Sequence, residues 1–229
     1  GVRRYDYART EGDFHAENIR IGGGRIVFDL VSPLGNISDI ELGVPVSINI
    51  DNGIAACALA QIAGASAEEI REGMRTYAGV DRRFDFKIKN DRCVFLSDYA
   101  HHPAEIKQSI QSLREVFDGR KISAIFQPHL YTRTRDFYGD FAEALSLLDE
   151  VILLDIYPAR ELPIEGVTSQ LIYDRLRPDM QRRMAHLQDL PKIAEEEDFD
   201  VLVVLGAGDA DTYCPQIADI LRAKYQIEA

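Results

Sequence analysis

The sequence has 229 residues, of which 46% are hydrophobic and 28% are charged, a balance that indicates a folded globular protein rather than a disordered one. Its formal net charge of −12 argues against a protein that tracks a nucleic-acid backbone, because such a protein needs a basic face. The longest apolar runs have only the length of a core strand, and the three cysteines show no metal-binding spacing, so we expect a cytoplasmic protein with reduced thiols.

The first part of the chain is predicted to form short strands followed by two helices. The predicted strands cover residues 16–21, 25–32 and 37–46, and the helices cover residues 49–63 and 67–77. Three glycines, residues 22–24, separate the first two strands and indicate a hairpin. Ser66 and Glu69 have the spacing of a capping box, which marks the start of the second helix.

From about residue 82 onward, strands and helices alternate. The predicted strands cover residues 84–89, 93–97, 121–126, 150–156, 184–187 and 201–205, and the helices cover 103–117, 134–148, 168–176, 191–197 and 211–225. This alternation predicts an α/β fold with a mainly parallel sheet flanked by helices. Ligands bind such folds at the carboxyl ends of the strands, so the loops that follow the strands deserve the closest inspection.

The first of these loops places an acid and two histidines in one strand-to-helix turn. Asp98, His101 and His102 precede Pro103, which starts the next helix. These side chains suit a ribose, a metal or a reacting carboxylate. The alternative is a helix cap with solvated histidines, but a cap needs one polar residue rather than three, so we favour a functional site.

The second loop brings an arginine to the point where a strand ends and a helix starts. There, backbone N–H groups and the guanidinium of Arg133 can together bind a carboxylate. The alternative is a surface arginine paired with Asp136 or Asp140, and this fits Arg135 better than Arg133.

The third loop, Gly206-Ala207-Gly208-Asp209, begins like a dinucleotide-binding fingerprint. Asp211 stands at the third glycine position, which argues against a nicotinamide dehydrogenase and favours a tight turn. The chain contains no G-x-x-x-x-G-K-[ST] loop, no G-x-S-x-G elbow and no H-E-x-x-H motif.

In their order, these loops resemble the Mur ligases, and within that family the ligases that join L-alanine to UDP-N-acetylmuramate. The resemblance covers essentially the whole chain. Its most specific motifs are Asp98-Tyr-Ala-His101-His102-Pro103-x-Glu105 and Phe126-Gln-Pro-His129-x-Tyr-Thr-Arg133-Thr-Arg135-Asp136, with further matches at residues 49–56, 79–84 and 158–169.

The resemblance implies two domains. Residues 1–80 would be the C-terminal part of a central ATPase domain, and residues 81–229 would be a Rossmann-like C-terminal domain. The missing phosphate-binding loop is then expected to be a truncation, and Gly1, which is not a natural start, agrees with this.

The resemblance also implies an enzyme of peptidoglycan precursor synthesis that uses Mg²⁺ and ATP. The lactyl carboxylate of UDP-N-acetylmuramate would be phosphorylated, and the amine of L-alanine would attack the acyl phosphate. Such a reaction depends on positioning and charge neutralisation. Neither nucleic acid nor a membrane is expected as a partner.

Individual roles follow from the same resemblance. Asn52 would contact the adenine, and Arg83 and Asp98 would meet the phosphate and ribose of ATP. His129 and Arg133 would hold the α-carboxylate of L-alanine, and His101 and His102 would lie with Asp98 near the reacting centre. No residue is assigned to a metal.

Two positions depart from the family pattern, because Ile48 replaces a histidine and Leu130 replaces an arginine. The second change leaves Arg133 with more of the binding of the alanine carboxylate. Two other functions remain open, namely a ligase that recycles murein tripeptide and a non-catalytic nucleotide-binding module. The recycling ligase shares Ala-His-His-Pro but lacks the run from His129 to Arg135.

Overall fold

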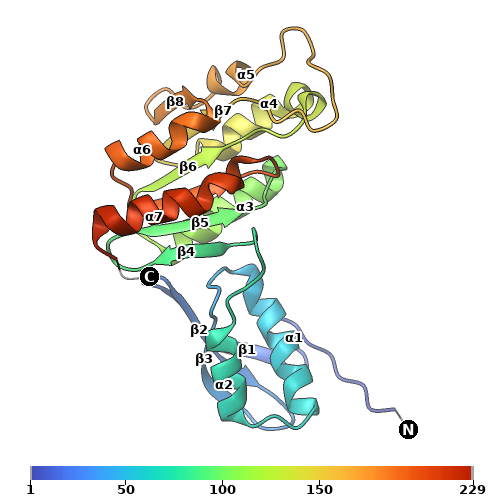
Figure 1. Ribbon diagram of the computed structural model, residues 1–229. Coiled ribbons are helices and arrows are strands. Elements are labelled where there is room, and N and C mark those ends of the chain that lie inside the picture. The colour runs from blue at the N-terminus through green and yellow to red at the C-terminus, as the bar shows by residue number, and fades with distance from the viewer. Residues whose placement is uncertain (1, 228–229) are drawn as a thin grey trace. The chain divides into compact units, whose positions relative to one another are not determined.

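The computed structural model describes residues 2–227, which divide into two compact units (Figure 1). The first unit comprises the chain up to Gly79 together with Glu115–Asp118, and the second comprises Val80–Arg114 and the chain from Gly119 onward. Each unit has its own sheet and is described by itself. In the part of the chain that the structure describes, no helix is both long and apolar enough to cross a bilayer.

The first unit is a three-stranded antiparallel sheet with two helices. Its elements are β1 (His15–Gly22), β2 (Arg25–Val31), β3 (Ile37–Glu41), α1 (Ile48–Ile62) and α2 (Ala67–Thr76), with the strands in the order β1-β2-β3. Gly22 pairs with Arg25, and the two glycines between them both have positive φ, so the predicted hairpin is confirmed. The predicted capping box at Ser66 and Glu69 is also confirmed.

The second unit is a six-stranded sheet flanked by helices, so the predicted fold class is confirmed. The strands are β4 (Asp85–Lys89), β5 (Val94–Asp98), β6 (Ile122–Phe126), β7 (Glu150–Leu154), β8 (Gln181–Ala185) and β9 (Val201–Leu205), in the order β4-β5-β9-β6-β7-β8. The helices are α3 (Pro103–Val116), α4 (Tyr131–Leu145), α5 (Gln170–Tyr173), α6 (Leu190–Glu196) and α7 (Cys214–Tyr225). Only β4 runs antiparallel to its neighbour among these described strands.

The four central strands are buried along their whole length, which explains their continuous apolar sequences. β9 is the last of the described strands in chain order, yet it lies between β5 and β6. Because β5, β9, β6 and β7 are parallel, the loops that follow them emerge at one edge of the sheet.

Three of the predicted elements that differ from the structure have a physical reason in their packing or position. The strand predicted over residues 37–46 ends at Glu41, because Gly43 turns the chain against the backbone of Tyr77 too closely for a Cβ. The helix predicted over 168–176 is only one turn, α5. The strand predicted over 184–187 is β8, which begins three residues earlier, at Gln181. It lies at an edge of the sheet, where charged residues such as Arg182 and Arg183 are common.

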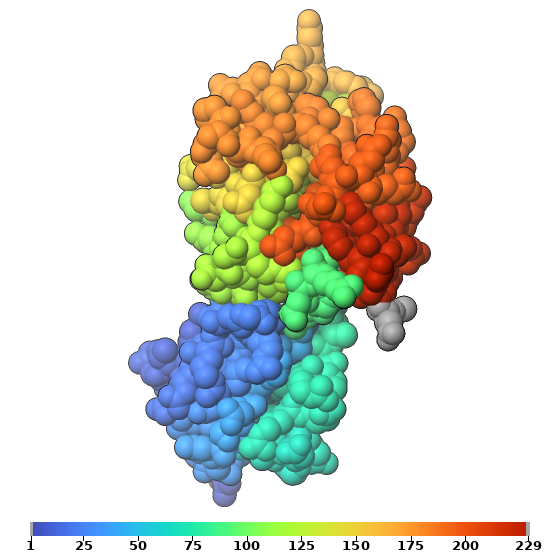
Figure 2. Space-filling view, turned by 90° about the vertical axis from the view of Figure 1, so that its left-hand side faces the viewer, coloured from blue at the N-terminus to red at the C-terminus, as the bar shows by residue number. Residues whose placement is uncertain are grey.

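The loop between β7 and α5 stands out from the second unit, and its tip is the protrusion at the top of Figure 2. Leu162 in this loop is 85% exposed. The base of the same loop, by contrast, is held at the carboxyl edge of the sheet by the contacts described below.

Candidate functional site

The candidate site is built from the loops that follow β5, β6, β7 and β9. The loops after β6 and β7 are joined by backbone hydrogen bonds, from the Leu130 N–H to the Tyr157 carbonyl at 2.9 Å and from the Tyr157 N–H to the Pro128 carbonyl at 2.8 Å. The loops after β6 and β9 are joined through the side chain of Gln127, which donates to Asp209 at 2.7 Å and accepts from the Ala210 N–H at 2.9 Å. The carboxyl edge is therefore a connected set of loops.

The glycine turn after β9 is a packing feature of this edge. A Cβ on Gly206, where φ is +132°, would lie 2.7 Å from the Gln127 carbonyl oxygen, and one on Gly208 would overlap the Gln127 side chain. Arg82 donates to the Gly206 and Gly208 carbonyls at 3.3 and 3.2 Å and pairs with Asp211 at 3.0 Å. Close approach to Gln127 thus accounts for both glycines.

Asp98, at the end of β5, is 7% exposed. One carboxylate oxygen accepts from the Ser109 hydroxyl at 2.6 Å, and the other accepts from the Phe84 N–H at 3.4 Å. Burial raises the pKa of the Asp98 carboxyl, although these hydrogen bonds and the charge of Arg83 act in the opposite direction. The ionised carboxylate only accepts hydrogen bonds, so a ribose hydroxyl that met it would donate.

His101 and His102 begin the turn that leads into α3. Their backbone N–H groups both donate to Glu105, at 3.0 and 3.1 Å, so Glu105 caps the helix, and its carboxylate also lies 3.4 Å from Nδ1 of His101. Nδ1 of His101 lies 2.9 Å from the Tyr99 carbonyl oxygen and must donate its proton there, which leaves Nε2 as an acceptor in the neutral ring. The ring of His102 instead packs against Phe137 of α4, with centroids 5.2 Å apart.

Arg82 and Arg83 both lie against the ring of Tyr99. Their guanidinium carbons are 4.7 and 6.0 Å from its centroid. Arg82 donates its hydrogen bonds to the carbonyls of the glycine turn, whereas Arg83 contributes positive charge near the Asp98 carboxylate. Of the two, Arg83 is therefore the better suited to meet an anionic ligand.

His129 and Arg133 come together at the start of α4. Arg133 Nη1 lies 3.4 Å from His129 Nδ1, and since a guanidinium only donates, Nδ1 is the unprotonated nitrogen. The ring of His129 lies 6.1 Å from that of His101, centroid to centroid. Burial, Arg133 and His101 lower the pKa of His129, so its ring is neutral at pH 7.

No role was predicted for two residues of this edge. Tyr157 stacks on His129, with centroids 5.6 Å apart and planes 25° apart. Glu161 accepts hydrogen bonds from the backbone N–H and the hydroxyl of Thr132. The backbone donor at Thr132 is thus already used by Glu161. Glu161 lies within the motif over residues 158–169 and Tyr157 directly precedes it, so this motif is the sequence signal that could have indicated both residues.

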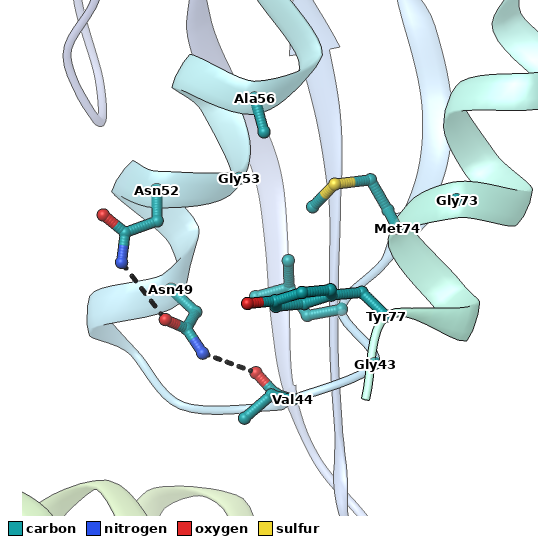
Figure 3. Close-up of a pocket in the computed structure, with 10 residues that line it drawn as sticks. Gly43, Val44, Asn49, Asn52, Gly53, Ala56, Gly73, Met74 and Tyr77 are labelled. Carbon is teal, nitrogen blue, oxygen red and sulfur yellow. Dashed lines mark hydrogen bonds between the residues drawn. The ribbon is translucent and has the colours of Figure 1, made fainter. Parts of the chain in front are cut away.

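Asn52 belongs to the first unit, where it lines a pocket of about 380 Å³ (Figure 3). Asn52 donates to the Asn49 side chain at 3.2 Å, and Asn49 donates to the Val44 carbonyl at 3.1 Å. The pocket is otherwise lined by small and apolar residues, namely Leu42, Gly43, Gly53, Ala56, Gly73, Met74 and Tyr77. Apolar walls with an amide at the rim suit a flat heteroaromatic ring.

No metal centre is apparent among residues 2–227, where no three His, Cys, Asp or Glu side chains gather closely enough to hold an ion.

Comparison with known proteins identifies close relatives. Residues 82–208 match the family model described as Mur ligase, glutamate ligase domain. A UDP-N-acetylmuramate–L-alanine ligase from Phocaeicola vulgatus is 65% identical over 224 residues, which are 98% of this chain and 49% of the relative. Another, from Porphyromonas gingivalis, is 47% identical over 207 residues, which are 90% of this chain and 45% of the relative. The chain thus spans about half the length of the curated relatives it matches.

Solved structures agree with this assignment. A UDP-N-acetylmuramate–alanine ligase from Thermotoga maritima matches with a TM-score of 0.73 at 26% identity, covering 96% of this chain and 47% of that one. A folylpolyglutamate synthase from the same organism has a TM-score of 0.67 at 16% identity, covering 93% of this chain and 47% of that one. At this identity, the match shows a shared fold only. Since the family model spans more than half of its residues, the chain belongs to the Mur ligase family.

Proposed function

We propose that this chain supplies the amino-acid-binding part of a cytoplasmic, ATP-dependent ligase that joins L-alanine to UDP-N-acetylmuramate in peptidoglycan precursor synthesis. The observation that carries the proposal is the 65% identity to a ligase of that name over nearly the whole chain. The pairing of His129 with Arg133 at the carboxyl edge supports it, because a guanidinium beside a neutral imidazole offers several donors to one carboxylate.

In this proposal, residues 1–80 are the C-terminal part of the central ATPase domain and residues 81–229 are the C-terminal domain. Arg133 and His129 bind the α-carboxylate of L-alanine, with Arg133 taking the main charge because Leu130 offers none. His101 and His102 lie near the reacting centre, and Nε2 of His101 is free to accept a proton from the attacking amine.

Three residues are proposed to bind ATP. Asn52 contributes an amide to the adenine from the pocket of the first unit. Arg83 neutralises phosphate charge, and the buried Asp98 carboxylate accepts from the ribose. Mg²⁺ would enter with the nucleotide and neutralise phosphate charge. Without a G-x-x-x-x-G-K-[ST] loop, these 229 residues alone are expected not to turn over ATP.

Phosphate release tests the proposal in the complete enzyme, with ATP, Mg²⁺, UDP-N-acetylmuramate and either L-alanine or the murein tripeptide. Release that depends on L-alanine is the expected result. Release only with the tripeptide would identify the recycling ligase and overturn the roles given to His129 and Arg133. A non-catalytic nucleotide-binding module would give no release with either.

Arg133→Ala provides the residue-level test, and Arg135→Ala is its matched control. Arg135 is exposed and paired with Asp136 at 2.8 Å, so its removal should leave the rate unchanged. Arg133→Ala should raise the KM for L-alanine at least about tenfold, because a charged hydrogen-bonding partner of a carboxylate is lost. Equal effects of the two substitutions would contradict the assignment.

A further inference from the structure

The helix that carries Arg133 begins without a local cap. Leu130, the residue before α4, has no capping side chain, and the first turn of the helix contains no acidic residue. A helix N-terminus leaves backbone N–H groups unpaired and carries partial positive charge, both of which favour a nearby acceptor or anion. Leu130 also has φ of +75°, a costly backbone conformation for a residue with a Cβ. Something outside the helix must therefore fix this turn.

The missing acceptor comes from the loop between β7 and α5. The Thr132 N–H donates to Oε2 of Glu161 at 3.0 Å, and the Thr132 hydroxyl donates to Oε1. Hydrogen bonds from Thr132, with a further one from the Tyr131 N–H, lower the pKa of Glu161, so it is a carboxylate at pH 7. Glu161 lies 29 residues beyond Thr132, and it caps α4 from that distance in the sequence.

The same loop also holds His129. Tyr157 stacks on the imidazole, and its backbone exchanges hydrogen bonds with Pro128 and Leu130 on either side. The Glu161 N–H donates to the Pro158 carbonyl at 2.9 Å, which closes the turn that brings the chain from Tyr157 to Glu161. The loop thus contacts both ends of the segment from His129 to Thr132.

We propose that Glu161 is a positioning residue of the amino-acid site. Its carboxylate fixes the first turn of α4 against the loop, and this sets the orientation of His129 and Arg133 toward the carboxylate of an amino-acid substrate. A second consequence concerns recognition, because Glu161 already accepts from the Thr132 and Tyr131 N–H groups at the start of α4. The substrate carboxylate is then bound by the two side chains, in the manner expected of a small free amino acid. This inference rests on the proposed function for the identity of the substrate.

Steady-state kinetics of the complete enzyme, with L-alanine, ATP and UDP-N-acetylmuramate varied in turn, tests the proposal. Glu161→Ala should raise the KM for L-alanine about tenfold or more, since small misplacements of binding groups have effects of this size, while the KM for ATP stays the same. Glu161→Gln keeps an acceptor for the Thr132 N–H and should recover most of the affinity. Glu165→Gln, an exposed acid of the same loop, is the matched control and should have no effect.

The outcomes separate positioning from mere stabilisation. If Glu161→Ala lowers the melting temperature but leaves the KM for L-alanine unchanged, Glu161 is only a structural cap and the proposal is wrong. If Glu161→Gln is as damaging as Glu161→Ala, the charge rather than the cap matters, and positioning through α4 is also wrong.

A readout without turnover keeps this inference distinct from the proposed function. In the 229-residue chain, Glu161→Ala should speed hydrogen exchange of the Thr132 amide and shift the NMR signals of the His129 ring, and Glu165→Gln should do neither. If the unmodified complete enzyme shows no release that depends on L-alanine, the proposed function fails, and these NMR measurements alone then decide whether Glu161 positions His129. Unchanged His129 signals would overturn it.

Discussion

Gly208 packs so closely against Gln127 that no side chain can replace its hydrogen. An added Cβ would overlap the amide of Gln127 and lie 2.9 Å from the Cβ of Tyr157. Gln127 cannot move aside cheaply, because it is buried and hydrogen-bonded to both Asp209 and Ala210. This packing and these hydrogen bonds join the end of β6 to the turn after β9 at the carboxyl edge of the sheet.

Gly208→Ala should therefore destabilise the second unit by about 1–3 kcal/mol, the usual cost of forcing extra volume into a packed site. Gly139→Ala is the matched control, because Gly139 is an exposed residue within α4 where a Cβ meets nothing within 4 Å. It should stabilise the helix by about 0.5–1 kcal/mol. Urea unfolding followed by circular dichroism measures both changes, and a neutral Gly208→Ala would contradict the packing argument.

Two apolar residues of α1 provide a second matched pair. Ile54 is fully buried in the first unit, whereas Leu59 is 70% exposed. Ile54→Ala should lower the free energy of unfolding of this unit by about 2–5 kcal/mol, because it leaves a cavity. Leu59→Ala should change it by less than about 0.5 kcal/mol. Denaturant titrations of the two variants give the comparison, and similar losses would mean that the outer face of α1 is covered.

The three free cysteines should be unreactive in the folded protein. Burial raises the pKa of Cys57 to about 12 and those of Cys93 and Cys214 to about 11, so almost no thiolate is present at pH 7.5. Iodoacetamide should label none of them until denaturant is added, as followed by peptide mass spectrometry. Cys57 then reports on the first unit and the other two on the second. Rapid labelling of native Cys93 would show that its burial is incomplete.

The pKa values of two histidines should be shifted from 6.5 in opposite directions, which NMR titration measures. Hydrogen bonding to Asp155, at 2.6 Å, raises the pKa of the exposed His186, and Asp155→Asn should return it toward 6.5. Burial and the charge of Arg133 lower the pKa of His129, and Arg133→Gln should raise it without reaching 6.5, because burial remains. Unchanged values in the two variants would contradict these causes.

The two histidines also have opposite effects on stability. The stability that His186 contributes is fully present below 6.5 and is lost as pH rises through its folded pKa. The unfolded chain protonates His129 more readily than the folded one, so its contribution to stability is lost as pH falls from 6.5 through its folded pKa.

Asp98→Asn should separate stability from function. The folded-state pKa of Asp98 is raised above 3.8, so its ionisation costs stability, and this cost develops as pH rises from 3.8 through the folded value. Asn removes that cost, and its amide can donate to Ser109 while its oxygen accepts from the Phe84 N–H. The variant should be at least as stable at pH 7, yet the complete enzyme should bind ATP more weakly.

Asp98→Ala is the control for that experiment. It leaves the Ser109 hydroxyl and the Phe84 N–H without their acceptor and should cost about 1–3 kcal/mol. Thermal melts at pH 5 and pH 7 test both variants. A large loss of stability in Asp98→Asn at pH 7 would show that the carboxylate charge stabilises the fold.

The features that were predicted well from the sequence are those determined by residues that are neighbours in the chain. The glycines of the first hairpin, the capping box at Ser66 and the apolar run of β9 each determine their structure locally. The features that it did not reveal depend on residues far apart in the chain. Glu161 meets Thr132 from another loop, and burial raises the pKa of Asp98, which no neighbouring residue in the sequence indicates.

The α4 helix illustrates why boundaries are harder to predict than elements. Its start was predicted at residue 134, but it begins at Tyr131, because Leu130 adopts a positive φ that no sequence pattern for leucine suggests. Because the capping carboxylate comes from another loop, the residues at the start of α4 contain no capping signal. For the candidate site, the residue types were visible in the sequence, and only the fold brings His129 within 6.1 Å of His101.

The position of β9 has a consequence for how the protein is made. Synthesis delivers the strands in chain order, so β5 and β6 emerge from the ribosome with a gap between them that only residues 201–205 can fill. Until then, both strands present unpaired edges, which invite association with other chains. The second unit is thus expected to complete its sheet only after residues 201–205 have left the ribosome, and until then folding and binding by chaperones compete.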